Sequence, residues 1–175
     1  MGIESVADRR PPKAILVNIS TGEEMEVLTN PTQVGEKVSV NYNRLAVPGL
    51  SHQVLQYQST GNTTLSSVEF YLDKYVASRS EDDPDILDFK RFLQALTVPP
   101  AGAEDILGGA PPRVLVIWPA ELFTLECVIT DVEFEYRQFS VDADVLVYVA
   151  QVTFEEIRDL RMTSEDLREL GSERG

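Results

Sequence analysis

The stretch Asn41–Leu72, NYNRLAVPGLSHQVLQYQSTGNTTLSSVEFYL, decides how this chain is organised. It begins where the alternating run Val38–Tyr42 ends, passes through the aperiodic segment Arg44–His52, and leads into a second alternating run, Leu65–Leu72. A connection that only joins two strands is usually short and polar. We therefore expect the apolar side chains of the aperiodic segment to pack against another surface, such as a second subunit. These side chains are Leu45, Val47 and Leu50.

Working outward, alternating apolar runs predict a mainly β protein with antiparallel strands. Besides Leu65–Leu72, strands are expected at Ala14–Ser20, Glu23–Thr29, Val34–Tyr42, Arg113–Trp118, Leu122–Tyr136 and Val145–Phe154. The first three are expected to pair in chain order, with Ile15, Val17 and Ile19 sharing one face. Arg113–Trp118 is nearly all apolar, which is typical of a strand buried on both faces. Both faces of Val145–Phe154 are apolar, so this strand is either central or covered by a second subunit.

The run Leu122–Tyr136 changes parity halfway along. Leu125, Cys127 and Ile129 occupy odd positions, whereas the later apolar residues occupy even ones. A period-2 pattern cannot change face unless a residue is inserted or the strand breaks. We therefore predict a β-bulge or a sharp bend near Thr130–Asp131.

One helix is expected inside the domain, at Pro84–Leu96. Ile86, Phe89 and Leu93 fall on one helical face together with Leu96. Asp83 is predicted as the N-cap and Pro84 as the first helical residue. The Pro- and Gly-rich segment Pro99–Pro112 is expected to be a long loop.

Composition narrows the function classes. A chain of 175 residues with 43% hydrophobic residues is long enough for one globular domain. The net charge of −14 argues against nucleic-acid-binding and anionic-membrane surfaces, which need clustered Lys and Arg. No apolar run is long enough to span a bilayer, and Met1–Arg10 lacks the apolar core of a secretory signal.

Single residues offer little chemistry. Cys127 alternates with core positions and is expected to be a small buried hydrophobe. His52, beside Ser51, has no third member that would suggest a catalytic triad, so it is interpreted as a loop or subunit-contact residue. With one Cys and one His, most zinc sites and nucleophilic triads are excluded.

Two sets of acidic residues have structural explanations that involve no catalysis or metal binding. Asp82, Asp83 and Asp85 lack the spacing and the glycine of a calcium hand, and helix capping accounts for them. Glu126, Glu133 and Glu135 could in principle do acid–base work on a sugar, but alternation of Glu with apolar residues is also what a half-exposed strand looks like. No catalytic, metal or cofactor site is predicted.

Six short segments carry a resemblance, in this order along the chain: Asn30–Pro31, Asn41–Arg44, Val47–His52, Leu55–Tyr57, Thr64–Ser66 and Phe70–Asp73. Together they resemble the tube and baseplate-tube proteins of contractile injection systems and contractile phage tails, especially the N-terminal domain of the adaptor-type members. The resemblance covers roughly Ala14 to Phe154. Adaptor-type relatives commonly continue into a LysM-type domain that binds peptidoglycan. Because only a short charged tail follows here, cell-wall binding is not carried over.

The resemblance implies an antiparallel β-sandwich or open barrel whose six copies form a ring with a continuous inner β-barrel. The implied role is structural and without a cofactor: a ring at the baseplate end of the inner tube, joining the tube to the central hub and spike. Expected partners are further copies, the tube protein, the hub or spike protein, and baseplate wedge or sheath proteins. DNA or cargo would pass through the channel without specific binding. Assembly is expected in the bacterial cytoplasm, within a virion or a released injection particle.

Three segments are expected: an arm at 1–13, the tube-like domain at 14–154 and a charged, partly helical tail at 155–175. The subunit interface is expected to include Tyr42, Arg44, Leu45, Val47, Leu50, His52 and Tyr57. Glu126, Glu133 and Glu135 are expected to face the lumen, where an acidic wall would repel DNA or anionic cargo. The alternative from another class is a monomeric β-sandwich that binds a small ligand or carbohydrate. It would need a concave pocket with aromatic walls.

Overall fold

The computed structural model describes residues 12–49, 51–77, 85–100, 109–119 and 122–158. These residues form a seven-stranded antiparallel sheet in the order β2-β1-β7-β8-β9-β6-β3 and a separate two-stranded sheet, β4-β5. The expected mainly β, antiparallel fold with one main helix is confirmed. The strands are β1 Ile15–Asn18, β2 Glu24–Glu26, β3 Gly35–Lys37, β4 Val40–Leu45, β5 Val54–Thr60, β6 Thr64–Asp73, β7 Val114–Ile117, β8 Thr124–Phe139 and β9 Val145–Glu156.

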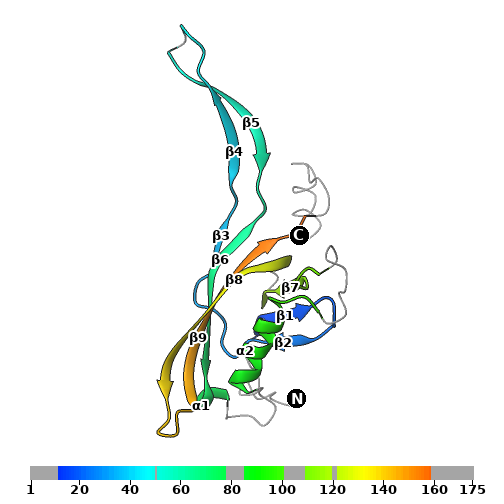
Figure 1. Ribbon diagram of the computed structural model, residues 1–175, viewed down its shortest axis with the longest axis vertical. Coiled ribbons are helices and arrows are strands. Elements are labelled where there is room, and N and C mark those ends of the chain that lie inside the picture. The colour runs from blue at the N-terminus through cyan, green and yellow to red at the C-terminus, as the bar shows by residue number, and fades with distance from the viewer. Residues whose placement is uncertain (1–11, 50, 78–84, 101–108, 120–121, 159–175) are drawn as a thin grey trace, which may run out of the picture.

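The main helix, α2 (Ile86–Ala95), covers one face of the sheet. Figure 1 shows it beside β1 and β2, on one side of the long ribbon made by β6, β9 and β8. The predicted apolar face is buried, with Phe89 2% exposed and Leu93 fully enclosed. Each such side chain stabilises the fold by about 1.5–3 kcal/mol relative to an exposed position. The helix begins two residues later than predicted. Asp85, not Asp83, is the N-cap, and its carboxylate accepts a hydrogen bond from the Leu87 N–H at 3.4 Å.

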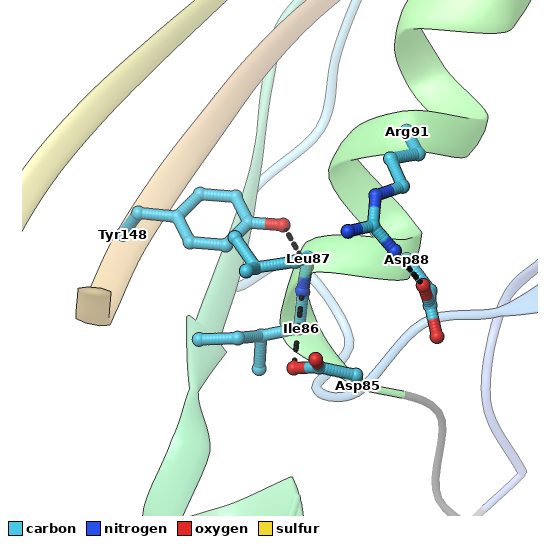
Figure 2. A network of polar contacts seen from close by, with 6 residues as sticks. All are labelled: Asp85, Ile86, Leu87, Asp88, Arg91 and Tyr148. Atoms are coloured by element: carbon cyan, nitrogen blue, oxygen red, sulfur yellow. Dashed lines mark hydrogen bonds and ion pairs between the residues drawn. The ribbon is translucent and has the colours of Figure 1, made fainter. Parts of the chain in front are cut away.

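Strand β9 is the centre of the ribbon, which is one of the two alternatives that its two apolar faces left open. It pairs with β6 on one side and with β8 on the other, antiparallel in both cases. Tyr148, Ala150 and Val152 are buried on the side of the helix. The Tyr148 hydroxyl donates a hydrogen bond to the Ile86 carbonyl, which ties the first turn of α2 to the ribbon (Figure 2).

The predicted bulge in β8 is confirmed. The register shifts between Ile129 and Asp131, so that Thr130 is the extra residue. A matching bulge occurs in β6 between Leu65 and Val68, where Ser67 takes a positive φ of 50°. The two bulges meet the same residue of β9. Thr153 accepts the Ser67 N–H on its hydroxyl oxygen at 3.4 Å, and its carbonyl accepts the Thr130 hydroxyl at 3.3 Å. The ribbon is therefore irregular along one line that crosses all three strands.

Two predictions about the first strands are wrong. The run Val34–Tyr42 is not one strand. Its first part, β3, pairs with β6, and its second part begins β4, which pairs with β5. Only β1 and β2 pair as expected. On β1 the core side is Ala14 and Leu16, while Ile19 is 45% exposed. Sequence patterns did not separate these faces, because both sides of β1 are apolar.

Other boundaries differ in smaller ways. Helix α1 (Lys74–Ala77), a single turn directly after β6, was not predicted, and neither was β5. Strand β8 begins at Thr124 instead of Leu122 and continues to Phe139, three residues past its predicted end at Tyr136. In β7, Val114 and Val116 are buried, but the other face is only half-buried.

Candidate subunit interfaces

The β4–β5 hairpin extends away from the rest of the molecule at one end (Figure 1). Its strands pair only with each other, and every residue in them is exposed. A two-stranded hairpin without a covered face is marginally stable in water at best. This hairpin is therefore an element that gains stability when another surface covers it.

The hairpin has one apolar face, here called the hairpin face. Residues directly opposite each other in an antiparallel pair lie on the same side. The register pairs Tyr42 with Tyr57 and Arg44 with Leu55. The two tyrosine rings meet edge to face with centroids 6.0 Å apart. The hairpin face consists of Val40, Tyr42, Arg44, Leu55, Tyr57 and Thr60. The opposite side is rich in amides and hydroxyls, with Asn41 donating to Ser59 Oγ at 3.3 Å.

The predicted interface residues all belong to this hairpin or to the segment that connects its strands. Tyr42, Arg44 and Tyr57 lie on the hairpin face, whereas Leu45 pairs with Val54 on the opposite side. Val47 and His52 are exposed in the connecting segment. The last member of the predicted set, Leu50, lies outside the described residues.

Two strand edges of the ribbon have no described partner strand. Strand β8 pairs with β7 only over residues 124–127, so residues 128–139 pair on one side alone, with β9. Strand β6 pairs with β3 only at Thr64–Ser66, so residues 68–73 also pair only with β9. We call these segments the open edges of β8 and β6. Their unpaired N–H and C=O groups can accept a further strand. Sequence patterns could not reveal them, since an edge is a property of backbone pairing.

The side of the ribbon opposite α2 is acidic. Glu126 precedes the β8 bulge and Glu133 and Glu135 follow it, and because of the bulge all three lie on this same side. In the neighbouring strands Glu133 pairs with Gln151, which pairs in turn with Glu69 and donates to its carboxylate at 3.1 Å.

Two arginines partly neutralise this acidic side. Arg113 lies 2.8 Å from Glu126, and Arg137 lies 3.1 Å from Glu135. The hydrogen bond from Arg137 to Glu135 raises the pKa of that guanidinium. Both ion pairs are solvent-exposed, so neither contributes much to the stability of the fold. The remaining carboxylates leave the surface negative.

Three features of the described residues bear on metal, thiol and ligand chemistry. The described residues include no group of three His, Cys, Asp or Glu residues placed to hold a metal ion. Burial, with smaller contributions from the Glu156 and Glu126 charges, raises the pKa of Cys127 to about 12. Its thiol is therefore neutral at physiological pH, as expected for a core residue. A cavity inside the core, lined in part by Phe70 and Trp118, has a volume of about 10 Å³, far too small for a ligand.

No helix in the described part of the chain is long and apolar enough to cross a membrane.

Two comparisons with known proteins bear on these surfaces. A search of curated proteins finds no match. A family model described as "Contractile injection system tube protein" matches residues 14–164, which is most of the chain. That family is structural, in agreement with surfaces suited to assembly. The chain therefore belongs to the contractile injection system tube protein family.

Proposed function

We propose that six copies of this chain form a ring at the baseplate end of the inner tube and join the tube to the central hub and spike. The observation that carries this proposal is the pair of open edges on opposite sides of one ribbon. A monomer with two such edges is exposed to uncontrolled strand pairing. A ring gives both edges a partner.

The topology indicates how copies would join. Because β8 and β6 both run antiparallel to β9, they run parallel to each other. Rotating one copy about a ring axis places the open edge of β8 beside the open edge of β6 in the next copy, also in parallel. Repeating the rotation closes the sheet into a barrel without edges. A two-fold pairing of β8 with itself would leave both β6 edges unpaired, so a cyclic ring satisfies more backbone groups.

The acidic side of the ribbon would then line the channel. Helix α2 covers the other side of the ribbon, so it would lie outside the barrel (Figure 1). An acidic wall with Glu126, Glu133 and Glu135 repels DNA and anionic cargo and keeps them from adhering. In this role the protein needs neither a cofactor nor a catalytic residue.

The remaining partners follow from the proposed position. A ring at the end of a tube contacts the tube protein on one side and the hub or spike protein on the other. Wedge or sheath proteins would surround it. We propose assembly in the bacterial cytoplasm and a place in a virion or a released injection particle. Most of the N-terminal arm and most of the C-terminal tail, which flank the 14–154 domain, lie outside the described residues.

Cysteine pairs can test the ring at its seam. Within one chain β9 separates β8 from β6, so their Cα atoms lie two strand spacings apart, about 9.5 Å. This distance is too long for a disulfide. A disulfide between Glu69→Cys and Glu133→Cys, or between Glu69→Cys and Glu135→Cys, must therefore join two copies. We expect oxidation to give a ladder of covalent species that ends at six chains.

Single-cysteine variants are the matched control and should give no such ladder. Negative-stain images and native mass spectrometry, recorded with and without the tube protein, should show six-fold rings that cap tube ends. A chain that stays a monomer at high concentration and ignores the tube protein would contradict the proposal and favour the binding module.

A further inference from the structure

Both edges of the ribbon carry exposed aromatic side chains at the end far from the hairpin (Figure 1). At the β6 edge, α1 follows directly after Asp73, and its Tyr75 is 64% exposed. At the β8 edge, Phe139 is 54% exposed. Asp73 and Gln138 pair with Val147 of β9 from opposite sides, so the two aromatic residues lie at nearly the same level of the ribbon. Aromatic side chains in such positions are of the kind that interfaces bury.

The aromatic residues at the β8 edge are held in place by their own chain. We call Tyr136 and Phe139, whose ring centroids lie 6.3 Å apart, the aromatic shelf. The Tyr136 ring also lies 6.0 Å from the ring of Tyr148, which is fully buried. The Lys90 ammonium of α2 lies 5.1 Å from the centroid of the Tyr136 ring. Because these contacts already fix Tyr136, little side-chain freedom is lost when a partner covers the shelf.

Helix α1 is fixed in a similar way at the β6 edge. Ala77 is buried in the same core as the apolar face of α2, so α1 turns toward the side of the ribbon that α2 covers. The Tyr75 N–H donates to the Asp73 carboxylate at 2.8 Å, which fixes the start of the helix. Tyr75 and Val76, which is 37% exposed, are the apolar side chains that α1 leaves uncovered. The aromatic shelf lies on this same side of the ribbon, because Tyr136 contacts α2.

We propose that Tyr75 and Val76 on α1 of one copy pack on the aromatic shelf of the next copy in the ring. This inference rests on the proposed function, in which the open edge of β6 in one copy lies beside the open edge of β8 in a neighbour. Backbone hydrogen bonds would join the two strands. The side-chain contact would cover the seam on its outer side, where α2 lies.

The strand registers show why the occupant of the shelf is a second copy. Within one chain β9 lies between β6 and β8, so α1 and the shelf belong to opposite edges. Parallel pairing between copies brings the end of β6 in one copy beside the end of β8 in the next. The shelf spans about 10 Å along β8, so a stagger of about two or three residues, as barrel closure requires, still leaves α1 beside it. The contact is therefore incomplete in a single copy.

Substitutions on the two sides of the seam test the contact in the full chain. Tyr75→Ser or Phe139→Ser should raise the concentration at which half of the chains are in rings by about tenfold, because each leaves its partner side chain uncovered. The double variant should be little worse than either single one, since the effects of residues in contact do not add. Tyr75→Phe keeps the aromatic ring and should assemble like the wild type. Ile19→Ser, which removes a 45% exposed apolar side chain beyond the end of β1, is the matched control and should change assembly little.

Sedimentation velocity measures the rings, and urea unfolding measures the stability of each chain. Weaker rings from both single variants, with a non-additive double variant and an unchanged urea midpoint, would support the inference. Rings as stable as those of the wild type from either single variant, or fully additive losses, would overturn it and leave the proposed ring intact. A urea midpoint that falls in both single variants would show that these side chains stabilise their own chain, and would also overturn it. A wild type that forms no rings would contradict the proposed function as well.

Discussion

Thr130 is the extra residue of the β8 bulge, and its deletion should turn the following part of the strand inside out. Before the bulge the core side chains occupy odd positions, and after it they occupy even ones. Without Thr130, residues up to the next register shift, between Tyr136 and Gln138, would move to the opposite face. Glu133 and Glu135 would then point at α2.

The cost can be estimated from the residues that exchange places. Keeping a glutamate neutral in the core at pH 7 means protonating it well above its normal pKa of about 4.3, which costs about 3.7 kcal/mol. Two glutamates double this cost. Val132 and Phe134 are half-buried, and exposing them would lose roughly 1 kcal/mol each. The total, about 10 kcal/mol, is comparable to the entire stability of a domain of this kind. We therefore expect no cooperative unfolding transition in the deletion variant.

A compensating variant distinguishes the change of face from the general damage of a deletion. It combines the Thr130 deletion with Val132→Glu, Glu133→Val, Phe134→Glu and Glu135→Phe, so that apolar side chains return to the core. The same four substitutions without the deletion should be as harmful as the deletion alone. Urea unfolding followed by circular dichroism measures all three. A deletion variant whose urea midpoint lies close to that of the wild type, or a compensated variant that stays unfolded, would refute the reasoning.

Three further predictions concern single sites. Tyr148→Phe removes a buried hydrogen bond to the first turn of α2 and should lower the free energy of unfolding by about 1–2 kcal/mol. The control Tyr136→Phe, at a position 37% exposed, should change the free energy of unfolding by less than about 0.5 kcal/mol. Equal losses for the two variants in urea titrations would mean that the hydrogen bond is unimportant. Gly22→Ala, at a φ of +73°, should lower the free energy of unfolding by about 1 kcal/mol. Gly35→Ala, whose new methyl group would make only ordinary contacts with Ser66, should leave the free energy of unfolding nearly unchanged. Equal effects of the two substitutions would mean that the turn conformation does not matter. Because the pKa of Cys127 is raised in the folded state, the folded protein holds this proton longer than the unfolded chain does. The contribution of Cys127 to stability is therefore constant below pH about 9 and falls by up to about 1.4 kcal/mol per pH unit toward pH 12. The stability difference between the wild type and Cys127→Ala should shrink over that pH range. A difference that stays constant would contradict this prediction.

The fold was predictable wherever the buried residues recur in the sequence at the period of a strand or a helix. Phe70 and Leu72 on β6, and Phe89 and Leu93 on α2, repeat at the spacing that their elements require to reach one core. The bulge at Thr130 was predictable for the same reason, because a change of parity has few structural explanations. The N-cap of α2 was not predictable in the same way. Several aspartates lie close together before this helix, and the sequence pattern does not say which of them directly precedes the first helical residue.

The hairpin was the main failure, and its cause is physical. The alternation of Val38, Val40 and Tyr42 predicts that these side chains are aligned on one strand, Val34–Tyr42. In the structure Val40 is 46% exposed and Tyr42 is 51% exposed. Alternation records that one face will be covered, but it does not say by what. That the apolar connection packs on a partner stays a prediction. Strand β5 was missed because Val54–Thr60 contains four polar residues besides Tyr57, and these interrupt an apolar alternation. They are Gln56, Gln58, Ser59 and Thr60.

The same reasoning predicts that the two kinds of contact can be separated by mutation. Pairing at the open edges of β8 and β6 would use backbone N–H and C=O groups, which every non-proline residue carries, so side-chain substitutions on the acidic side of the ribbon change it little. Packing of the hairpin face depends on particular side chains, Tyr42, Arg44 and Tyr57 among them, and is sensitive to each. Substitutions in the hairpin face should therefore weaken its contacts with a partner while rings joined at the strand edges persist. Loss of the rings in every hairpin-face variant would show that the hairpin is part of the ring contact.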